Sequence, residues 1–300
     1  MIVEVIAVGT ELLLGQIVNT NAADIGTRLA EDGFDVHHQV TVGDNLERLV
    51  ATIRAATDRA DAVVMTGGIG PTQDDMTRDA LCVVLGTDVV RDERHATLIA
   101  DRLAARGVVA DTALRMADYP AGTTPLPNSK GVALGIAATS DGIPIFAVPG
   151  VPTEMRAMLD NEVRPRLRAA SGEPSALVNR VLHCWGLGES QIAERLDDLY
   201  ERTNPSLAFL INGPEVRVRI TAKAADADRA GALITEVESE VRHRLGEAVF
   251  ATDHETVDGQ VGELLADAGW TIAVVEILTA GEVSTRLATV PGFVGGTVVV

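Results

Sequence analysis

A glycine-rich turn followed by two carboxylates is the strongest chemical signal in the chain, and it reads Thr-Gly-Gly-Ile-Gly-Pro-Thr-Gln-Asp-Asp-Met-Thr. Gly67, Gly68 and Gly70 follow a predicted strand, where glycines let the backbone turn sharply and point N–H groups at an anion. The adjacent Asp74 and Asp75 would repel a phosphate unless a cation lay between them. The pattern therefore favours a phosphate bridged by a hard divalent metal on oxygen ligands.

The same run also has a purely structural interpretation. The three glycines could simply make a tight turn between a strand and a helix, and the two Asp could simply cap that helix. Glycine-rich turns are weak signals by themselves, so the spacing does not separate the two interpretations.

Three further runs add candidate polar residues. Glu11 follows a strand, and ligands of open α/β sheets bind where strands end. It could be a metal ligand or a base, or it could only shape its turn through hydrogen bonds to loop amides. Lys130, in a loop that also holds Asn128, is either a phosphate contact or a solvated lysine. Asn21 lies in the same run as Glu11, and Gly150 lies in the third run.

The sequence lacks the residue patterns of several other common kinds of site. The six His are scattered, and His37 and His38 would face opposite sides of a strand, so they cannot readily share a metal. The sequence contains no Gly-x-Ser-x-Gly nucleophile elbow. Metal-assisted chemistry on a phosphate is therefore the better-supported reaction class.

The acidic composition argues against several partners. The 300 residues hold 25 Lys plus Arg and 43 Asp plus Glu, a formal net charge of −18. Nucleic acids and anionic membranes both need basic surface, so we expect neither as a partner. No apolar run approaches the ~18 residues of a membrane span, and the acid-containing run Ile2–Val8 is typical of a buried strand rather than a signal peptide. With Cys82 and Cys184 as the two cysteines, we expect reduced thiols and a cytoplasmic protein.

Alternating strand and helix patterns must position the candidate residues. Residues 1 to about 90 repeat βα units, which imply a parallel sheet wrapped by helices, and Asn21 is expected to cap the first helix. Further helices are predicted over about 92–106 and 153–169. The predicted strands are Ile2–Val8, Asp35–Val42, Ala62–Thr66, Val132–Ala138 and Ile143–Val148.

After a candidate linker at Ser171–Ser175 the rhythm changes. The order β-α-β-β-α-β up to about residue 251 is the split βαβ plan of a smaller α+β domain. A new βα pattern starts near residue 256 and reaches Val300 inside an apolar strand, which we interpret as the start of a further α/β domain.

Four ordered motifs resemble the competence/damage-inducible family CinA, and the resemblance covers essentially the whole chain. The glycine and aspartate run and the Pro-Gly-Val-Pro-Thr-Glu-Met run are the specific ones together. The motifs are Gly9–Gly15 with Asn19–Asn21, Thr41–Asp44, Gly67–Thr77 and Val148–Met155.

The resemblance implies three parts. Residues 1–170 would form a three-layer α/β domain with a parallel sheet, similar to the molybdopterin-binding MoaB/MogA fold. Residues 175–252 would form a smaller α+β, KH-like domain, and residues 256–300 the start of a nicotinamide-nucleotide deamidase domain. The resemblance further implies a homodimer and a divalent-metal-dependent ADP-ribose pyrophosphatase, using Mg²⁺ or Mn²⁺ with K⁺ as a further candidate ion.

The sequence departs from the family pattern in three places. The deamidase nucleophile, a serine in the family, aligns with Ile277, which has no hydroxyl, so we expect no deamidase activity. The usual Gly-Thr-Ala-Pro-Gly loop reads Gly-Val-Ala-Leu-Gly at Gly131–Gly135, which removes one hydroxyl. The KH-like part lacks a Gly-x-x-Gly loop, and residues 175–255 carry 9 basic against 14 acidic residues, a net charge of −5 that disfavours RNA.

We therefore expect a hydrolase that cleaves ADP-ribose or a related nucleotide to AMP and ribose 5-phosphate. The catalytic residues would be Asp74, Asp75 and Glu11, with Asp74 and Asp75 also holding the metal. The alternatives are a molybdopterin-binding or adenylyl-transferring protein, and a non-catalytic dimeric binding module. The predicted substrate-binding and phosphate-binding residues are Gly67, Gly68, Gly70, Thr72, Asn21, Asn128, Lys130 and Gly150.

Overall fold

The computed structural model describes residues 1–105, 107, 111–172, 176–213 and 215–299. These residues fall into two compact units, Met1–Leu177 and Val178–Val300. Within the described residues, no helix is both long enough and apolar enough to cross a membrane.

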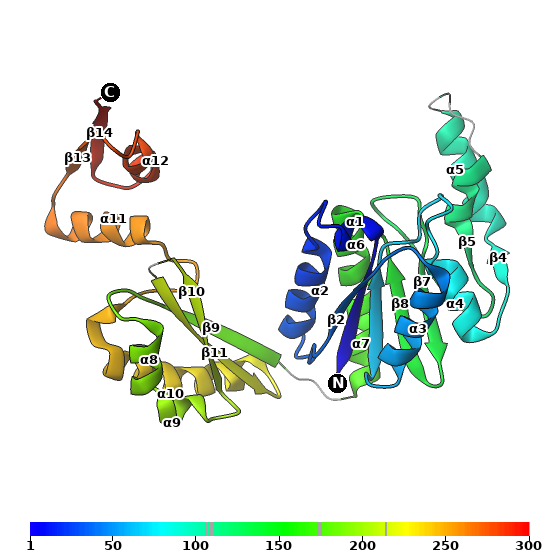
Figure 1. Cartoon of the computed structure of the whole chain (residues 1–300), viewed down its shortest axis with the longest axis horizontal. Helices are drawn as coiled ribbons and strands as arrows, with labels where there is room; N and C mark the ends of the chain where they lie inside the picture. Colours follow the sequence, from blue (N-terminus) through cyan, green and yellow to red (C-terminus); the bar gives the residue numbers. More distant parts are fainter. Residues whose placement is uncertain (106, 108–110, 173–175, 214, 300) are drawn as a thin grey trace. The chain divides into compact units, whose positions relative to one another are not determined.

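The first unit is built on a six-stranded mixed sheet (Figure 1), whose strand order is β2-β1-β3-β8-β7-β6. Four neighbouring strands, β2, β1, β3 and β8, run parallel; β7 pairs antiparallel with β8, and β6 pairs antiparallel with β7. The strands are β1 (Val3–Val8), β2 (Gln39–Val42), β3 (Ala62–Thr66), β6 (Thr124–Leu126), β7 (Gly135–Ser140) and β8 (Ile143–Val148).

The parallel sheet predicted from the βα repeats is thus confirmed for β2, β1, β3 and β8, whereas β7 runs in the opposite direction and makes the sheet mixed. Strand β7 ends at Ser140 and β8 begins at Ile143, so only Asp141 and Gly142 connect them. Both have a positive φ, 48° and 85°, as in a two-residue hairpin turn. Two residues cannot carry the crossover that a parallel pair requires.

Helices cover both faces of the sheet and make three layers (Figure 1). Strand β1 turns Val3 and Val5 to one apolar cluster and Ile6 and Val8 to the other, as alternation along a strand requires. The first cluster holds side chains of α2, α6 and α7, and the second holds side chains of α3 and α4. These helices are α2 (Thr20–Glu31), α3 (Leu46–Thr57), α4 (Thr77–Leu85), α6 (Pro152–Met158) and α7 (Arg164–Ser171), with a π-helical turn at Leu159–Val163.

The N-terminal cap of α2 is Asn19, whose side chain accepts a hydrogen bond from the Ala22 amide. Our expectation that Asn21 caps this helix is therefore wrong. Asn21 lies within the first turn, and its carboxamide is free to act elsewhere.

A small appendage beside α4 was not fully predicted from the sequence. Its helix α5 (Glu93–Ala104) matches the predicted one, but the strands β4 (Val89–Arg91) and β5 (Asp118–Pro120) were missed. A 3-10 helix, Asp111–Ala117, leads into β5. It carries Met116 toward the cavity described below.

The second unit begins with a four-stranded sheet in the order β10-β11-β9-β12, and its elements follow the predicted β-α-β-β-α-β succession except that the first helix is divided into α8 and α9. The elements are β9 (Ala176–Cys184), α8 (Glu189–Arg195), α9 (Asp197–Tyr200), β10 (Ser206–Asn212), β11 (Glu215–Ala224), α10 (Ala227–Leu245) and β12 (Val249–Thr252).

The last residues form a parallel βαβ arrangement, as predicted. Helix α11 (Val257–Ala268) precedes β13 (Ile272–Glu276), α12 (Glu282–Leu287) and β14 (Phe293–Val298). Both tryptophans of the chain, Trp185 and Trp270, belong to the second unit and are more than half exposed.

Candidate functional site

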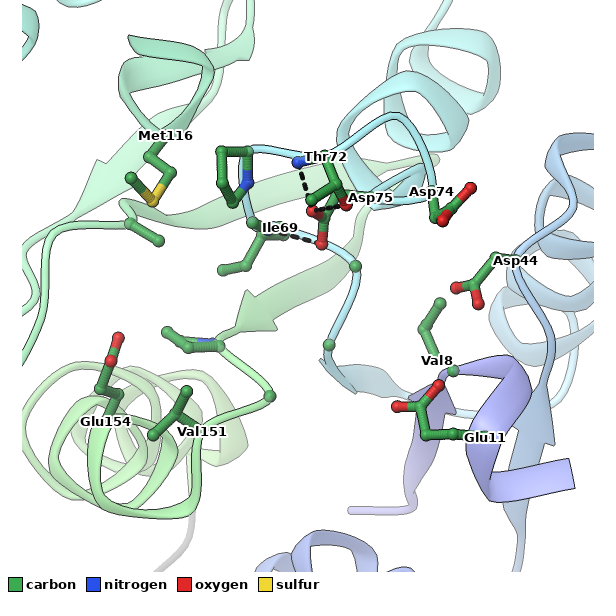
Figure 2. Close-up of a pocket in the computed structure, with 18 of the residues that line it drawn as sticks. Val8, Glu11, Asp44, Ile69, Thr72, Asp74, Asp75, Met116, Val151 and Glu154 are labelled. Atoms are coloured by element: carbon green, nitrogen blue, oxygen red, sulfur yellow. Dashed lines mark hydrogen bonds between the residues drawn. The ribbon is translucent and has the colours of Figure 1, made fainter. Parts of the chain in front are cut away.

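A cavity of about 500 Å³ opens where β1, β3 and β8 end (Figure 2). The carboxyl ends of neighbouring parallel strands meet at this edge, which is where open α/β sheets bind ligands. The lining residues are Val8, Gly9, Glu11, Asp44, Gly67, Gly68, Ile69, Gly70, Pro71, Thr72, Asp74, Asp75, Met116, Val132, Ala133, Pro149, Gly150, Val151 and Glu154.

The loop after β3 requires glycine at two positions. Gly67 and Gly68 have φ values of 96° and 67°, a left-handed conformation that side chains disfavour. A Cβ on Gly67 would overlap the Val8 carbonyl oxygen, and one on Gly68 would overlap Thr77 Oγ1. Thr77 Oγ1 donates in turn to the Gly67 carbonyl at 2.9 Å, so the loop has one defined shape.

Two of the three predicted phosphate-binding amides are already used within the protein. The Gly67 N–H donates to the Val148 carbonyl at 3.1 Å, and the Gly70 N–H donates to Asp75 Oδ1 at 2.8 Å. Gly68 and Ile69 keep amides without an acceptor in the described chain. The donors available to an anion therefore lie between the outer glycines of the motif.

A second pair of available amides lies next to this loop, after the end of β8. A Cβ on Gly150 would lie 3.4 Å from Gly67 Cα, so the two loops touch. In the described chain the amides of Gly150 and Val151, just before α6, also lack an acceptor. Helix N-termini leave such donors unsatisfied and favour negative charge.

The two aspartates of the motif differ in their hydrogen bonding. Asp75 accepts three hydrogen bonds, from the Gly70 amide and from the amide and hydroxyl of Thr72, at 2.6–2.8 Å. Asp74 is exposed and accepts none from the described residues. Neither caps α4, since Met76 holds the cap position without a side-chain bond. Asp75 thus anchors the loop, and Asp74 is the carboxylate available for a metal.

Two arginines donate hydrogen bonds to carbonyl oxygens of the glycine loop. The guanidinium of Arg78, 2% exposed, donates to the carbonyls of Ile69 and Gly70, and Arg115 donates to the Thr72 carbonyl at 2.7 Å. Burial lowers the pKa of Arg78 to about 10, which still leaves it charged at neutral pH. A positive charge therefore lies behind the loop.

The cavity itself is acidic. Figure 2 shows Glu11, Asp44 and Asp74 on one side, Met116, Val151 and Glu154 on the other, and the Ile69–Asp75 loop between them. Asp44 accepts from the Thr10 amide at 2.9 Å, and its own amide donates to Thr10 Oγ1 at 3.0 Å. The Glu11 carboxylate accepts no hydrogen bond from the described chain, so it does not shape its turn in that way. None of the lining residues is a lysine or an arginine.

The described residues contain no preformed metal site, since no three His, Cys, Asp or Glu among them are grouped to hold an ion. This differs from a structural metal site, which supplies most of its ligands from the protein. It resembles the usual Mg²⁺ arrangement, in which one or two carboxylates combine with water and substrate phosphates.

A smaller cavity of about 130 Å³ adjoins the first and shares Val8, Glu11, Gly67 and Gly150 with it. Asn21 lines this cavity, and its Nδ2 donates to Thr66 Oγ1 at 3.1 Å and to the Gly150 carbonyl at 2.7 Å. Asn21 therefore joins the ends of β3 and β8 at the wall of the site.

Asn128 and Lys130 lie outside the cavity, and Asn128 contacts the lining residue Glu154. The Asn128 Oδ1 accepts from the amides of Lys130 and Gly131, and its Nδ2 donates to Glu154 Oε2 at 2.7 Å. Neither Asn128 nor Lys130 lines either cavity. The phosphate contact of Lys130 thus stays a prediction without support from this geometry.

Comparison with known proteins gives the family. The model of the "Probable molybdopterin binding domain" matches residues 4–169, and the model of the "Damage-inducible protein CinA KH domain" matches residues 179–251. A CinA-like protein from Frankia casuarinae is 41% identical over 299 residues, covering 96% of this chain and 69% of that protein. The chain belongs to the CinA family.

Further CinA relatives agree. A CinA-like protein from Synechococcus elongatus is 38% identical over 291 residues, covering 96% of this chain and 69% of that protein. The crystal structure of CinA, of unknown function, from Thermoplasma acidophilum is 35% identical with a TM-score of 0.51, covering 55% of this chain and 96% of that one. The predicted fold class, a MoaB/MogA-like α/β domain followed by further α/β structure, is confirmed with the mixed sheet described above.

Three residues of this CinA site were missed as candidates from the sequence. Asp44 and Glu154 both lie in motifs that carry the family resemblance, and both line the cavity. Arg78 directly follows the glycine and aspartate run, but nothing in the sequence indicated that its side chain folds back under the loop. The predicted residues Glu11, Gly67, Gly68, Gly70, Thr72, Asp74, Asp75 and Gly150 all line the same cavity.

Proposed function

We propose that this CinA-family chain hydrolyses the pyrophosphate bond of ADP-ribose or a related nucleotide, giving AMP and ribose 5-phosphate. The observation that carries the proposal is one cavity lined both by available backbone amides and by two carboxylates, Glu11 and Asp74, that accept no hydrogen bond from the described residues. A volume of about 500 Å³ lies in the range of nucleotide-sized ligand sites.

Phosphate oxygens would bind the amides of Gly68 and Ile69 on one side and those of Gly150 and Val151 on the other. Preorganised backbone donors stabilise charge without moving during the reaction. The buried Arg78 behind the loop adds positive potential, which offsets part of the repulsion from the acidic lining.

The residues fit a divalent cation, Mg²⁺ or Mn²⁺, bound mainly through Asp74, with K⁺ as a further candidate ion. Asp75 would act through the loop or through water, because its oxygens already accept three hydrogen bonds. When bound, such an ion neutralises phosphate charge and lowers the pKa of water. Glu11, exposed and without a partner in the described chain, would accept the proton of the attacking water.

The test is a product assay with purified protein, ADP-ribose and either Mg²⁺, Mn²⁺ or EDTA, in which AMP is measured by chromatography. We expect metal-dependent AMP that falls by orders of magnitude in Asp74→Asn. Asp58→Asn, an exposed carboxylate at the end of α3, is the matched control and should keep full activity. Equal turnover in the Asp74 and Asp58 variants would overturn the metal assignment.

We propose in addition that the C-terminal segment has no deamidase activity. Ile277 stands where the family nucleophile is expected, and its side chain is 72% exposed. The adjacent Glu276 carboxylate accepts hydrogen bonds from Thr279 and Ser284, so it is committed to the start of α12. Release of ammonia from nicotinamide mononucleotide by the purified chain would refute this proposal.

A molybdopterin-binding protein is the second candidate, and the description of the family model that matches residues 4–169 favours it. Binding of molybdopterin without AMP formation from ADP-ribose would select it. In either case we propose a homodimer in the cytoplasm with a small-molecule ligand and no nucleic-acid partner. Light scattering tests the homodimer, and electrophoretic mobility with RNA tests the lack of a nucleic-acid partner.

A further inference from the structure

The cavity has a second charged end that the proposed hydrolysis leaves unused. Glu154, in the first turn of α6, lines the cavity on the side opposite Glu11, Asp44 and Asp74 (Figure 2). The glycine loop that would hold the phosphates lies between the two ends. A substrate group bound beside Glu154 would therefore lie on one side of the bound phosphates.

The position of the Glu154 carboxylate is fixed by its neighbours. Asn128 Oδ1 accepts hydrogen bonds from the amides of Lys130 and Gly131 at 3.0 and 2.8 Å, which sets the orientation of its carboxamide. Its Nδ2 consequently points to Glu154 Oε2 at 2.7 Å and to the Ala133 carbonyl at 3.1 Å. A Cβ on Gly131 would overlap the Glu154 carboxylate, so this loop admits the acid because it has glycine there.

The carboxylate retains acceptor capacity that the described chain does not use. Only Oε2 is hydrogen-bonded, whereas an ionised carboxylate accepts at both oxygens and donates at neither. Two apolar side chains, Met116 and Val151, lie on the same side of the cavity (Figure 2). This end therefore suits a flat apolar ring carrying a nearby pair of hydrogen-bond donors, and it repels phosphate.

We propose that Glu154 binds the 2′- and 3′-hydroxyls of the adenosine ribose, and so determines specificity for a ribonucleotide. This inference rests on the proposed function, because it places the nucleoside on one side of the phosphate-binding amides. In adenosine the ribose diol is the pair of adjacent donors. The adenine amino group lies beside ring nitrogens that are acceptors, and these would repel a carboxylate. In dinucleotide-binding folds a carboxylate likewise accepts a hydrogen bond from a ribose hydroxyl.

The test compares two nucleotides that differ only in the diol. Isothermal titration in Mg²⁺ measures α,β-methylene-ADP, whose bridging carbon blocks hydrolysis, and its 2′,3′-dideoxy form. Hydrogen bonds to a charged acceptor predict that the wild-type protein binds the ribose form about tenfold to a hundredfold more tightly. Glu154→Gln should bring this ratio close to one while leaving the affinity for the dideoxy form unchanged.

The matched control is Glu162→Gln, which changes a carboxylate of the same unit that pairs with Arg166 outside the cavity. It should keep the wild-type ratio. Melting temperatures of both variants report folding. If Glu154→Gln does not fold, Glu154→Asp supplies the same test, since it keeps the charge but withdraws it by one methylene.

Three results would overturn the inference. The wild-type protein could bind both nucleotides equally, Glu154→Gln could weaken both by the same factor, or a guanine analogue could bind more tightly than the adenine one. AMP production without discrimination against the dideoxy form would overturn this inference and leave the hydrolase standing. Discrimination that depends on Glu154, without AMP production, would support this inference and overturn the hydrolase.

Discussion

Replacing Asp75 by Asn should loosen the glycine loop, whereas the same change at Asp74 should leave it intact. Asp75 accepts hydrogen bonds from the Gly70 amide at 2.8 Å and from the amide and hydroxyl of Thr72 at 2.8 and 2.6 Å. An Asn side chain has one acceptor oxygen and an NH2 group. Whichever way it turns, at least one loop amide then faces a donor.

The magnitude follows from that lost bond. A hydrogen bond to a charged group contributes about 1.5–3 kcal/mol, and a donor left without its partner incurs a similar penalty. A central value of about 2 kcal/mol corresponds to roughly a thirtyfold change in the loop-opening equilibrium. Asp74, which accepts no bond from the described chain, should change stability by no more than about 0.5 kcal/mol, or roughly twofold.

Hydrogen exchange read by mass spectrometry measures this opening directly. Peptides that contain the amides of Gly70 and Thr72 should exchange roughly thirtyfold faster in Asp75→Asn than in the wild-type protein. Asp74→Asn should exchange like wild type while losing turnover of ADP-ribose. Unchanged exchange in Asp75→Asn, or equal acceleration in both variants, would refute the division of roles between the two carboxylates.

Three further outcomes are expected. Burial alone would raise the pKa of Asp32, but hydrogen bonds from two arginines of α7 outweigh it and hold the pKa below the ordinary 3.8. Its contribution to stability is therefore present above about pH 4 and lost below it, and Asp32→Asn should flatten the fall in melting temperature between pH 5 and 3. Burial raises the pKa of Cys184 to about 11, so iodoacetamide at pH 8 should label it only after denaturation, as counted by mass spectrometry. Gly68→Ala should lower the melting temperature more than Gly15→Ala, since both have φ near 67° but only the first would overlap Thr77 Oγ1.

Local patterns in the sequence were sufficient for most of the fold. The apolar stripe on α3, the glycine stop after α4 and the βα repeats each depend on neighbours within a few residues. The antiparallel direction of β7 was not predicted although Asp141 and Gly142 carry a hairpin signal, because the two flanking apolar runs also suit parallel strands. The short strands β4 and β5 have too few residues to show a period.

The candidate site was predictable in its residue types but not in how each one is used. Asp74 and Asp75 are adjacent and chemically identical, and only the loop geometry shows that one is hydrogen-bonded and the other is not. Likewise, the amides of Gly67 and Gly70 have acceptors supplied by β8 and by Asp75, which no spacing rule reveals. Long-range contacts such as that from Arg115 to the Thr72 carbonyl, 43 residues apart in the sequence, become visible once the chain is folded.

The location of both tryptophans in the second unit has a spectroscopic consequence. Intrinsic tryptophan fluorescence arises from Trp185 and Trp270 in the second unit, whereas the residues that line the cavity all belong to the first. An unchanged emission spectrum on adding a nucleotide would therefore not exclude binding. A Met116→Trp substitution in the cavity wall of a variant with both native tryptophans replaced by Phe would give a reporter whose entire signal arises at the ligand site.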